Sequence, residues 1–250
     1  GAQSPQGEVL SNGLVGYWKM DESSWTVACS TSSVLDSSGN NNNGKSCPTT
    51  TGPAGGATGK FGNGGSFDGT NDFVKAGAST SMSIPSDGTI AAWVKPSSLS
   101  SVAWIAATDA NNGDLQFGLE VGRTANKLDV IWGTSGGGFD ILYSTASLNT
   151  TSWQHVLVTR TRSGNTWTAK LYINGVLDST QTGTKDASSF SAAHIGSYQD
   201  AGGQTFSGSM DEVRMYNRAL TPAEVAQLYK FAPGPVGYWE FEEGSGTSAN

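Results

Sequence analysis

The chain has 250 residues and an acidic balance, with 14 Lys and Arg against 21 Asp and Glu. This length suits one large β domain or two small ones. The sequence carries no basic stripe of the kind that binds nucleic acid, and no apolar run reaches the roughly 20 residues of a membrane span. With 34 Gly and only 14% charged residues, the composition favours strands and turns over helices.

An internal repeat brackets the chain. Residues 13–22 read GLVGYWKMDE and residues 234–243 read GPVGYWEFEE, an offset of 221 positions (234 minus 13). An offset of this size indicates whole domains in tandem. We therefore expect a leader or linker over 1–12, one domain over 13–231, and over 232–250 a linker with the first strand of a following repeat. A chance match of a short Gly-Tyr-Trp string is the alternative.

The two cysteines lie near the N-terminus in polar surroundings. Cys29 and Cys47 both stand in stretches rich in Ser, Thr, Asn and Gly, which favours a surface disulfide and an oxidising compartment. Two free thiols are the alternative. Residues 37–44 and 51–65 are rich in Asn and Gly, and we expect them to form long ordered loops.

The middle of the chain predicts strands over 89–94, 153–160 and 166–173. Residues 153–160 carry apolar side chains at both alternating sets of positions, as expected for a strand near the middle of a sandwich. Asn174 and Gly175 then predict a type I′ hairpin turn. One helix is expected from Pro222 to about Tyr229, because Thr221 and Glu224 have the spacing of a capping box.

Several motifs recur in an order that resembles laminin-G-like jelly-roll domains of the concanavalin-like sandwich group. They are GLVGYWKMDE at 13–22, DSSGNNNNG at 36–44, FDGTNDFV at 67–74, TIAAWVKP at 89–96, WQHV at 153–156, LYINGV at 171–176 and FSGSMDEVRMYNRAL at 206–220. The resemblance implies an all-β fold, an antiparallel β-sandwich with one short C-terminal helix. It also implies an extracellular module that binds glycans or proteins, and many such domains carry calcium.

A structural calcium site is predicted in the first Asn-rich loop. Calcium prefers six to eight oxygen ligands on a loop that can wrap around it. By analogy with similar jelly rolls, a late strand carboxylate reaches the same ion. The candidate ligands are Asp36, Asn40, Asn42 and Asp211. Glu22 is a weaker candidate. The alternative is a solvated turn, with the strand carboxylate paired with Arg214 or Arg218.

Ligand contacts are predicted at two tryptophans and at a second acidic loop. Sugar binding uses flat rings against C–H faces, with amide and carboxylate groups bonded to hydroxyls. The candidate ligand-binding residues are Trp104, Asp109, Asn111, Asp114 and Trp132. Packing in the sandwich core is the alternative for either tryptophan, and a plain hairpin turn is the alternative for residues 109–114.

No catalytic constellation emerges from the sequence. Glu240 and Glu242 form the clearest acid pair at i and i+2, but they read as surface charge on a strand. His155 and His194 have no nucleophile elbow nearby. We therefore predict a non-enzymatic carbohydrate-binding or adhesion module, a monomeric domain in a tandem array on the cell surface. The alternatives are a spacer or protein-binding domain and, third, a glycan hydrolase.

Overall fold

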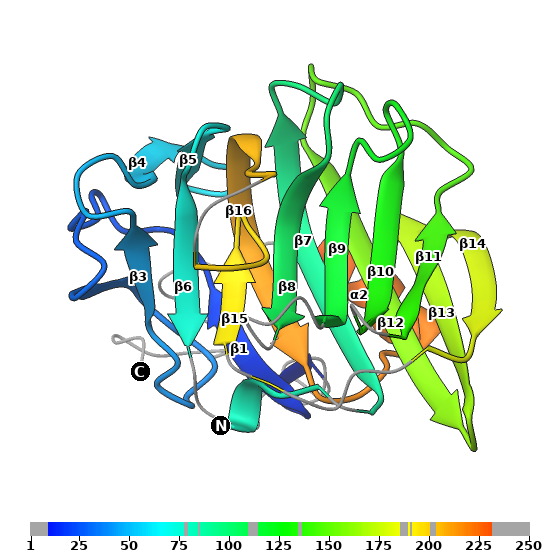
Figure 1. Ribbon diagram of the computed structural model, residues 1–250. Coiled ribbons are helices and arrows are strands. Elements are labelled where there is room, and N and C mark those ends of the chain that lie inside the picture. Colours follow the sequence, from blue (N-terminus) through cyan, green and yellow to red (C-terminus); the bar gives the residue numbers. More distant parts are fainter. Residues whose placement is uncertain are drawn as a thin grey trace, which may run out of the picture.

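The computed structural model describes residues 10–77, 80–84, 86–109, 115–134, 137–185, 190, 192–200 and 204–231. In this part of the chain two antiparallel sheets pack face to face, with one α-helix behind them (Figure 1). This arrangement confirms the predicted all-β sandwich. The second copy of the repeat lies outside the described residues. No helix among the described residues is long and apolar enough to cross a membrane.

Sheet A contains eight strands. They are β1 (Leu14–Trp18), β4 (Ala54–Thr58), β5 (Asn63–Asp68), β7 (Gly88–Pro96), β12 (Gln154–Ser163), β13 (Thr166–Ile173), β14 (Val176–Gly183) and β16 (Ser207–Tyr216). Their order is β14-β13-β12-β7-β16-β5-β4, and β1 pairs with β16. Pairing with β16 therefore joins β1, the first described strand, to the sheet that contains the last described strand.

Sheet B also contains eight strands. They are β2 (Ser32–Val34), β3 (Gly44–Cys47), β6 (Phe73–Gly77), β8 (Ala103–Asp109), β9 (Leu115–Val121), β10 (Leu128–Thr134), β11 (Gly138–Tyr143) and β15 (Ala192–Ile195). Their order is β11-β10-β9-β8-β15-β6-β3-β2. A short 3₁₀ helix, η1 (Thr80–Met82), follows β6.

The main hydrophobic core fills the space between the sheets. On β12, Val156 and Val158 point into this core, whereas Leu157 packs on the opposite face of sheet A. This explains why both alternating sets of the strand are apolar. Arg160 is fully buried, and its guanidinium lies over the rings of Phe117 and Trp167. That contact joins β12 of sheet A to β9 of sheet B.

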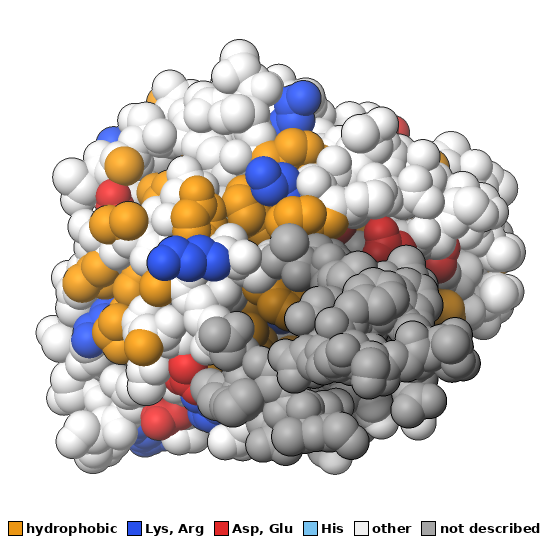
Figure 2. All heavy atoms as spheres, turned by 180° about the vertical axis from the view of Figure 1, so that it is seen from behind, with side chains coloured by type: hydrophobic (Ala, Val, Ile, Leu, Met, Phe, Trp, Pro, Cys, Tyr) orange, Lys and Arg blue, Asp and Glu red, His pale blue; other side chains and the backbone are white. Residues whose placement is uncertain are grey.

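The helix α2 (Pro222–Lys230) covers the middle of the outer face of sheet A. Its start has the predicted capping box, because Glu224 N donates to Thr221 Oγ1 and Thr221 N donates to a Glu224 carboxylate oxygen. Val225 and Leu228 pack in a cluster with Leu157. Seen from behind, hydrophobic side chains gather on this side of the molecule (Figure 2). The helix therefore covers part of the outer face of sheet A.

The predicted hairpin after β13 is confirmed, and the predicted long loop over 51–65 is wrong. Asn174 and Gly175 have φ values of 51° and 77°, as a type I′ turn requires. Residues 51–65 instead contain β4 and the start of β5. A Cβ at Gly55 would lie 2.8 Å from the Trp25 ring. The glycines there allow close packing of an edge strand, although they weaken the strand signal in the sequence.

The predicted pairing is confirmed, because Cys29 is bonded to Cys47 across a separation of 18 residues. The predicted surface position is wrong for Cys47, which is only 1% exposed. Replacing both cysteines with alanine should lower the free energy of unfolding by about 3 kcal/mol, since the bond restricts the unfolded chain. Urea denaturation measures the loss. Reduction of the unsubstituted protein serves as the control and should give a similar loss. An unchanged denaturation midpoint after reduction would contradict this assignment.

Candidate functional site

A row of side chains crosses the outer face of sheet B, the face toward the viewer in Figure 1. Strand pairing places in one row Lys75, His194, Ala107, Gly118, Ile131 and Ile141. Side chains alternate between the two faces of a strand, and Ala107 and Ile131 belong to a small cluster separate from the main core. The row therefore lies on the open side of the sandwich, charged at one end and apolar at the other.

Trp104 is the central aromatic residue of this face. Its ring centroid lies 5.1 Å from that of Tyr198, with 39° between the ring planes. The indole Nε1 donates to Gln204 Oε1 at 3.0 Å. A Cβ at Gly118 would lie 2.4 Å from Trp104 Cζ3. The glycine therefore gives the indole room to lie against β9.

Beside Trp104 the surface is hollowed into a groove of about 290 Å³. Its lining is apolar and aromatic except at two positions, and consists of Trp104, Leu115, Arg123, Ile131, Phe139, Ile141, Tyr198 and Gln204. Trp104 is only 3% exposed, whereas Phe139 at the groove is 40% exposed. Binding sites for small molecules combine apolar walls with a few polar groups in this way.

The groove residue Arg123 belongs to a compact charged cluster with Glu120 and Asp129. Glu120 and Asp129 are opposite each other on β9 and β10, and both are fully buried. Arg123 donates to both oxygens of Glu120, at 2.5 and 3.2 Å, and its main-chain N donates to Asp129 Oδ2 at 3.0 Å. Burial raises the pKa of Asp129 to about 7, against the opposing effect of the Arg123 N–H bond. These acids are thus held beneath the surface, bonded to Arg123.

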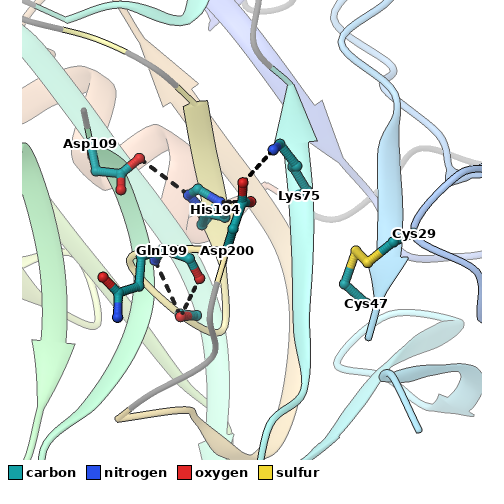
Figure 3. Close-up of polar contacts among 8 residues, drawn as sticks. Cys29, Cys47, Lys75, Asp109, His194, Gln199 and Asp200 are labelled. Carbon is teal, nitrogen blue, oxygen red and sulfur yellow. Dashed lines mark hydrogen bonds and ion pairs between the residues drawn. A yellow bond between two sulfur atoms is a disulfide. The ribbon is translucent and has the colours of Figure 1, made fainter. Parts of the chain in front are cut away.

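The end of the row that begins at Lys75 carries a buried histidine between two carboxylates (Figure 3). His194 Nε2 lies 2.9 Å from Asp200 Oδ1, and Nδ1 lies 3.4 Å from Asp109 Oδ1. Asp200 Oδ2 in turn accepts from Lys75 Nζ at 2.6 Å. Burial lowers the pKa of His194, but the bonds to both carboxylates outweigh burial and leave this pKa raised. Because Asp200 is two residues from Tyr198, the network holds the segment that carries the groove tyrosine.

The residues predicted to bind calcium lie in two separate hydrogen-bonded arrangements. Asp36 Oδ1 accepts from the main-chain N of Tyr17 and Ser38, and Oδ2 accepts from Ser38 Oγ and Asn42 N. The amide nitrogens of Asn40 and Asn42 donate to main-chain oxygens of β1. The first loop is therefore organised around the Asp36 carboxylate.

The other two calcium candidates bond to different segments. Asp211 on β16 accepts from Phe61 N at 2.9 Å, and burial raises its pKa to about 7. Glu22 accepts from Trp25 Nε1 and Leu35 N. Among the described residues no group of three or more His, Cys, Asp or Glu could hold a metal ion. As placed, Asp36, Asn40 and Asn42 form a hydrogen-bonded turn, and Asp211 bonds to a separate segment. Calcium binding stays a prediction for experiment.

The predicted ligand-binding residues lie in different environments in the fold. Trp104 and Asp109 both belong to β8 and lie beside the groove and the histidine network. Trp132 is fully buried in the core between the sheets. This corrects the expectation that it stacks on a ligand, because its ring presents no surface. Asn111 and Asp114 lie outside the described residues.

Sequence reasoning missed most of the groove. Phe139 and Ile141 alternate on β11, and this period of two was a usable signal. Tyr198 and Gln204 lie outside any regular strand, so no periodicity marks them. Arg123 reads as an ordinary turn residue until its bond to Glu120 is seen.

The fold defines a jelly-roll sandwich of the lectin type, and the sequence supports the same class. A family model described as the concanavalin A-like lectin/glucanases superfamily matches residues 68–226. The chain belongs to this superfamily. No curated protein matches the sequence.

Solved structures share the fold at low identity. The binding domain of Paraclostridial Mosquitocidal Protein 1 has a TM-score of 0.66 and 16% identity, with 88% of this chain and 52% of that chain covered. The ligand binding domain of botulinum neurotoxin serotype D, in complex with N-acetylneuraminic acid, has a TM-score of 0.66 and 14% identity, with 91% and 52% covered. This chain therefore spans about half the length of either domain.

A third similar structure matches over nearly its whole length. Domain 4 of AbnA, a GH43 extracellular arabinanase from Geobacillus stearothermophilus, was solved in complex with arabinotriose. It has a TM-score of 0.63 and 21% identity, with 87% of this chain and 98% of that chain covered. At these identities the likeness shows the fold.

The fit of the Asp36 loop to a hydrogen-bonded turn leads to a test of calcium binding. Thermal unfolding in excess calcium and in excess chelator should give the same melting temperature, because main-chain and side-chain donors already occupy the Asp36 oxygens. A higher melting temperature in calcium, lost in Asp36→Asn, would contradict this and establish the calcium site.

Asp129→Asn should stabilise the protein at alkaline pH. The pKa of Asp129 is about 7 in the fold against about 3.9 in an unfolded chain. The ionisation of Asp129 therefore costs no stability below pH ~4. The free energy of unfolding then falls as the pH rises from about 4 through 7. The variant should exceed the unsubstituted protein by about 1–3 kcal/mol at pH 8, and the difference should shrink toward pH 4. Urea denaturation at both pH values measures this, with the exposed Asp68→Asn as control. A less stable Asp129→Asn at pH 8 would oppose the account.

Proposed function

We propose that this chain is an extracellular carbohydrate-binding module that holds a sugar in the groove beside Trp104 on the outer face of sheet B. The observation that carries the proposal is the pairing of Trp104 with Tyr198 beside an apolar floor and the Gln204 amide. A sugar ring presents C–H faces to aromatic rings and hydroxyls to amides. The groove offers both kinds of partner within one small hollow.

Membership of a superfamily of lectins and glucanases supports this function. Two domains of the same fold were solved with sugars, one with arabinotriose and one with N-acetylneuraminic acid. The Cys29–Cys47 disulfide supports an extracellular location, because such bonds persist in oxidising compartments.

The groove favours binding over hydrolysis. Glycosidases present two carboxylates to the substrate, about 5 to 9 Å apart. Among the residues that the structure describes, Glu120 and Asp129 are the acids bonded to the groove residue Arg123, and both are fully buried. Neither carboxylate reaches the surface that a sugar would touch. We therefore propose a module without catalytic activity.

Removing an aromatic wall of the groove should weaken glycan binding. The probe is an array of neutral and acidic oligosaccharides, followed by calorimetry with each sugar that binds. Tyr198→Ala and Phe139→Ala should each reduce affinity by about tenfold, a loss near 1.4 kcal/mol. Both side chains are partly exposed, so the fold should survive their removal.

The control is Val176→Ala, which removes an exposed apolar side chain at the hairpin after β13 (68% exposed). It should leave affinity unchanged. If Tyr198→Ala and Phe139→Ala bound each sugar as tightly as Val176→Ala and the unsubstituted protein, the binding site would lie elsewhere. No binding of the unsubstituted protein to any sugar on the array would favour a spacer or protein-binding domain.

A further inference from the structure

A second, larger hollow of about 560 Å³ adjoins the groove. It lies where the turn after β5, the segment between β7 and β8, and the start of β16 meet. Its lining is mostly small and polar, and consists of Asp68, Gly69, Thr70, Ser98, Ser101, Val102, Ala103, Gln204, Thr205 and Ser207. Its size falls in the range of about 300–1,000 Å³ that small-ligand sites occupy.

Gln204 lines both hollows and is held firmly at their junction. Its φ is 54°, a left-handed conformation that is uncommon for a residue other than glycine. Trp104 N donates to its main-chain oxygen at 2.9 Å, and Trp104 Nε1 donates to its side-chain oxygen at 3.0 Å. Two bonds from one tryptophan thus fix a strained residue between the groove and the second hollow. Such strain is a recognised mark of functional positions.

The chemistry of the second hollow differs from that of the groove. The groove wall is aromatic, whereas the second hollow offers hydroxyls from Thr70, Ser98 and Ser101. Asp68 is the one charged residue among those that line it. The hydroxyls can donate hydrogen bonds to a polyhydroxyl ligand and accept them from it, and the carboxylate can accept them. The same carboxylate repels an anionic group.

We propose that the second hollow is an additional sugar subsite, which takes the neighbouring unit of a neutral oligosaccharide whose first unit lies beside Trp104. Gln204 contacts the linkage region between the two units. The aromatic groove binds one unit by its apolar face, and the polar hollow binds the next by its hydroxyls. The ligand class is therefore a neutral chain of at least two units. This inference rests on the proposed function.

Chain length tests the subsite. The probes are neutral xylo-, gluco-, galacto- and arabino-oligosaccharides of one to four units, measured by calorimetry. In any series that binds, affinity should rise at least tenfold from one unit to two or three. Ser101→Trp fills the hollow from an exposed position and should abolish this increase while leaving affinity for one unit unchanged. Ser163→Trp, at an exposed position away from the hollow, should retain the increase.

A retained increase in Ser101→Trp would overturn the subsite while leaving the groove intact as a binding site. Absence of binding in every neutral series, with binding of an acidic sugar on the array, would overturn the neutral subsite and leave the proposed function standing. Absence of binding to every sugar on the array would overturn the proposed function and, with it, the subsite. These failures are therefore distinguishable.

Charge provides a second, independent readout. Asp68→Asn should weaken binding of the neutral two-unit sugar, because the carboxylate accepts hydrogen bonds from its hydroxyls. It should raise affinity for a matched oligosaccharide that ends in a uronic acid by at least threefold at low salt, and this gain should shrink at high salt. Tighter binding of the acidic than of the neutral oligosaccharide by the unsubstituted protein would overturn the assignment to neutral chains.

Discussion

Burial of one face of each sheet against the other is the constraint on which the rest of the structure depends. Trp18, Trp132 and Trp167 fill the space between the sheets, and the buried Arg160 links the strands on its two sides. Each sheet then has one remaining face. The helix α2 covers the middle of that face on sheet A. On sheet B the equivalent face keeps a groove, so the packing of the sandwich determines where a ligand can bind.

The candidate site is assembled from segments far apart in the chain. Strand register brings β8, β9, β10 and β11 side by side, and Gly118 gives the Trp104 indole space above β9. The segment with Tyr198 is fastened to the sheet through Asp200, His194 and Lys75. Long-range pairing therefore builds the site, and each wall depends on the register of a different strand pair.

The sequence predicted the elements that are determined by residues close to one another in the chain. The capping box at Thr221, the Asn174-Gly175 turn and the alternation along 153–160 each encode their structure within a few residues. The pairing of the cysteines was predicted from the polar sequence around them, although Cys47 is buried in the fold. The strand β4 was missed because its glycines allow close contact with Trp25 at Gly55 and with Ser23 at Gly56, which no local pattern reveals.

The site was predicted only in part, because burial depends on which face a strand turns to the core. Trp104 and Trp132 look equivalent in the sequence, since the first follows a Ser-rich turn and the second precedes a Gly-rich stretch. In the fold the first lies at the groove and the second between the sheets. Gln204 is held at the groove by the bond from Trp104 Nε1. Tyr198 packs against the Trp104 ring, two residues before Asp200, which bonds to His194.

The most direct test of the account is to locate a bound sugar on the protein by nuclear magnetic resonance. In a titration with a neutral trisaccharide such as arabinotriose, shift changes should concentrate at the Trp104 indole N–H, Tyr198, Gln204 and the outer face of β9–β11. Changes confined to the Asp36 loop or to the surface around α2 would contradict the claim that the open face of sheet B is the ligand-binding face.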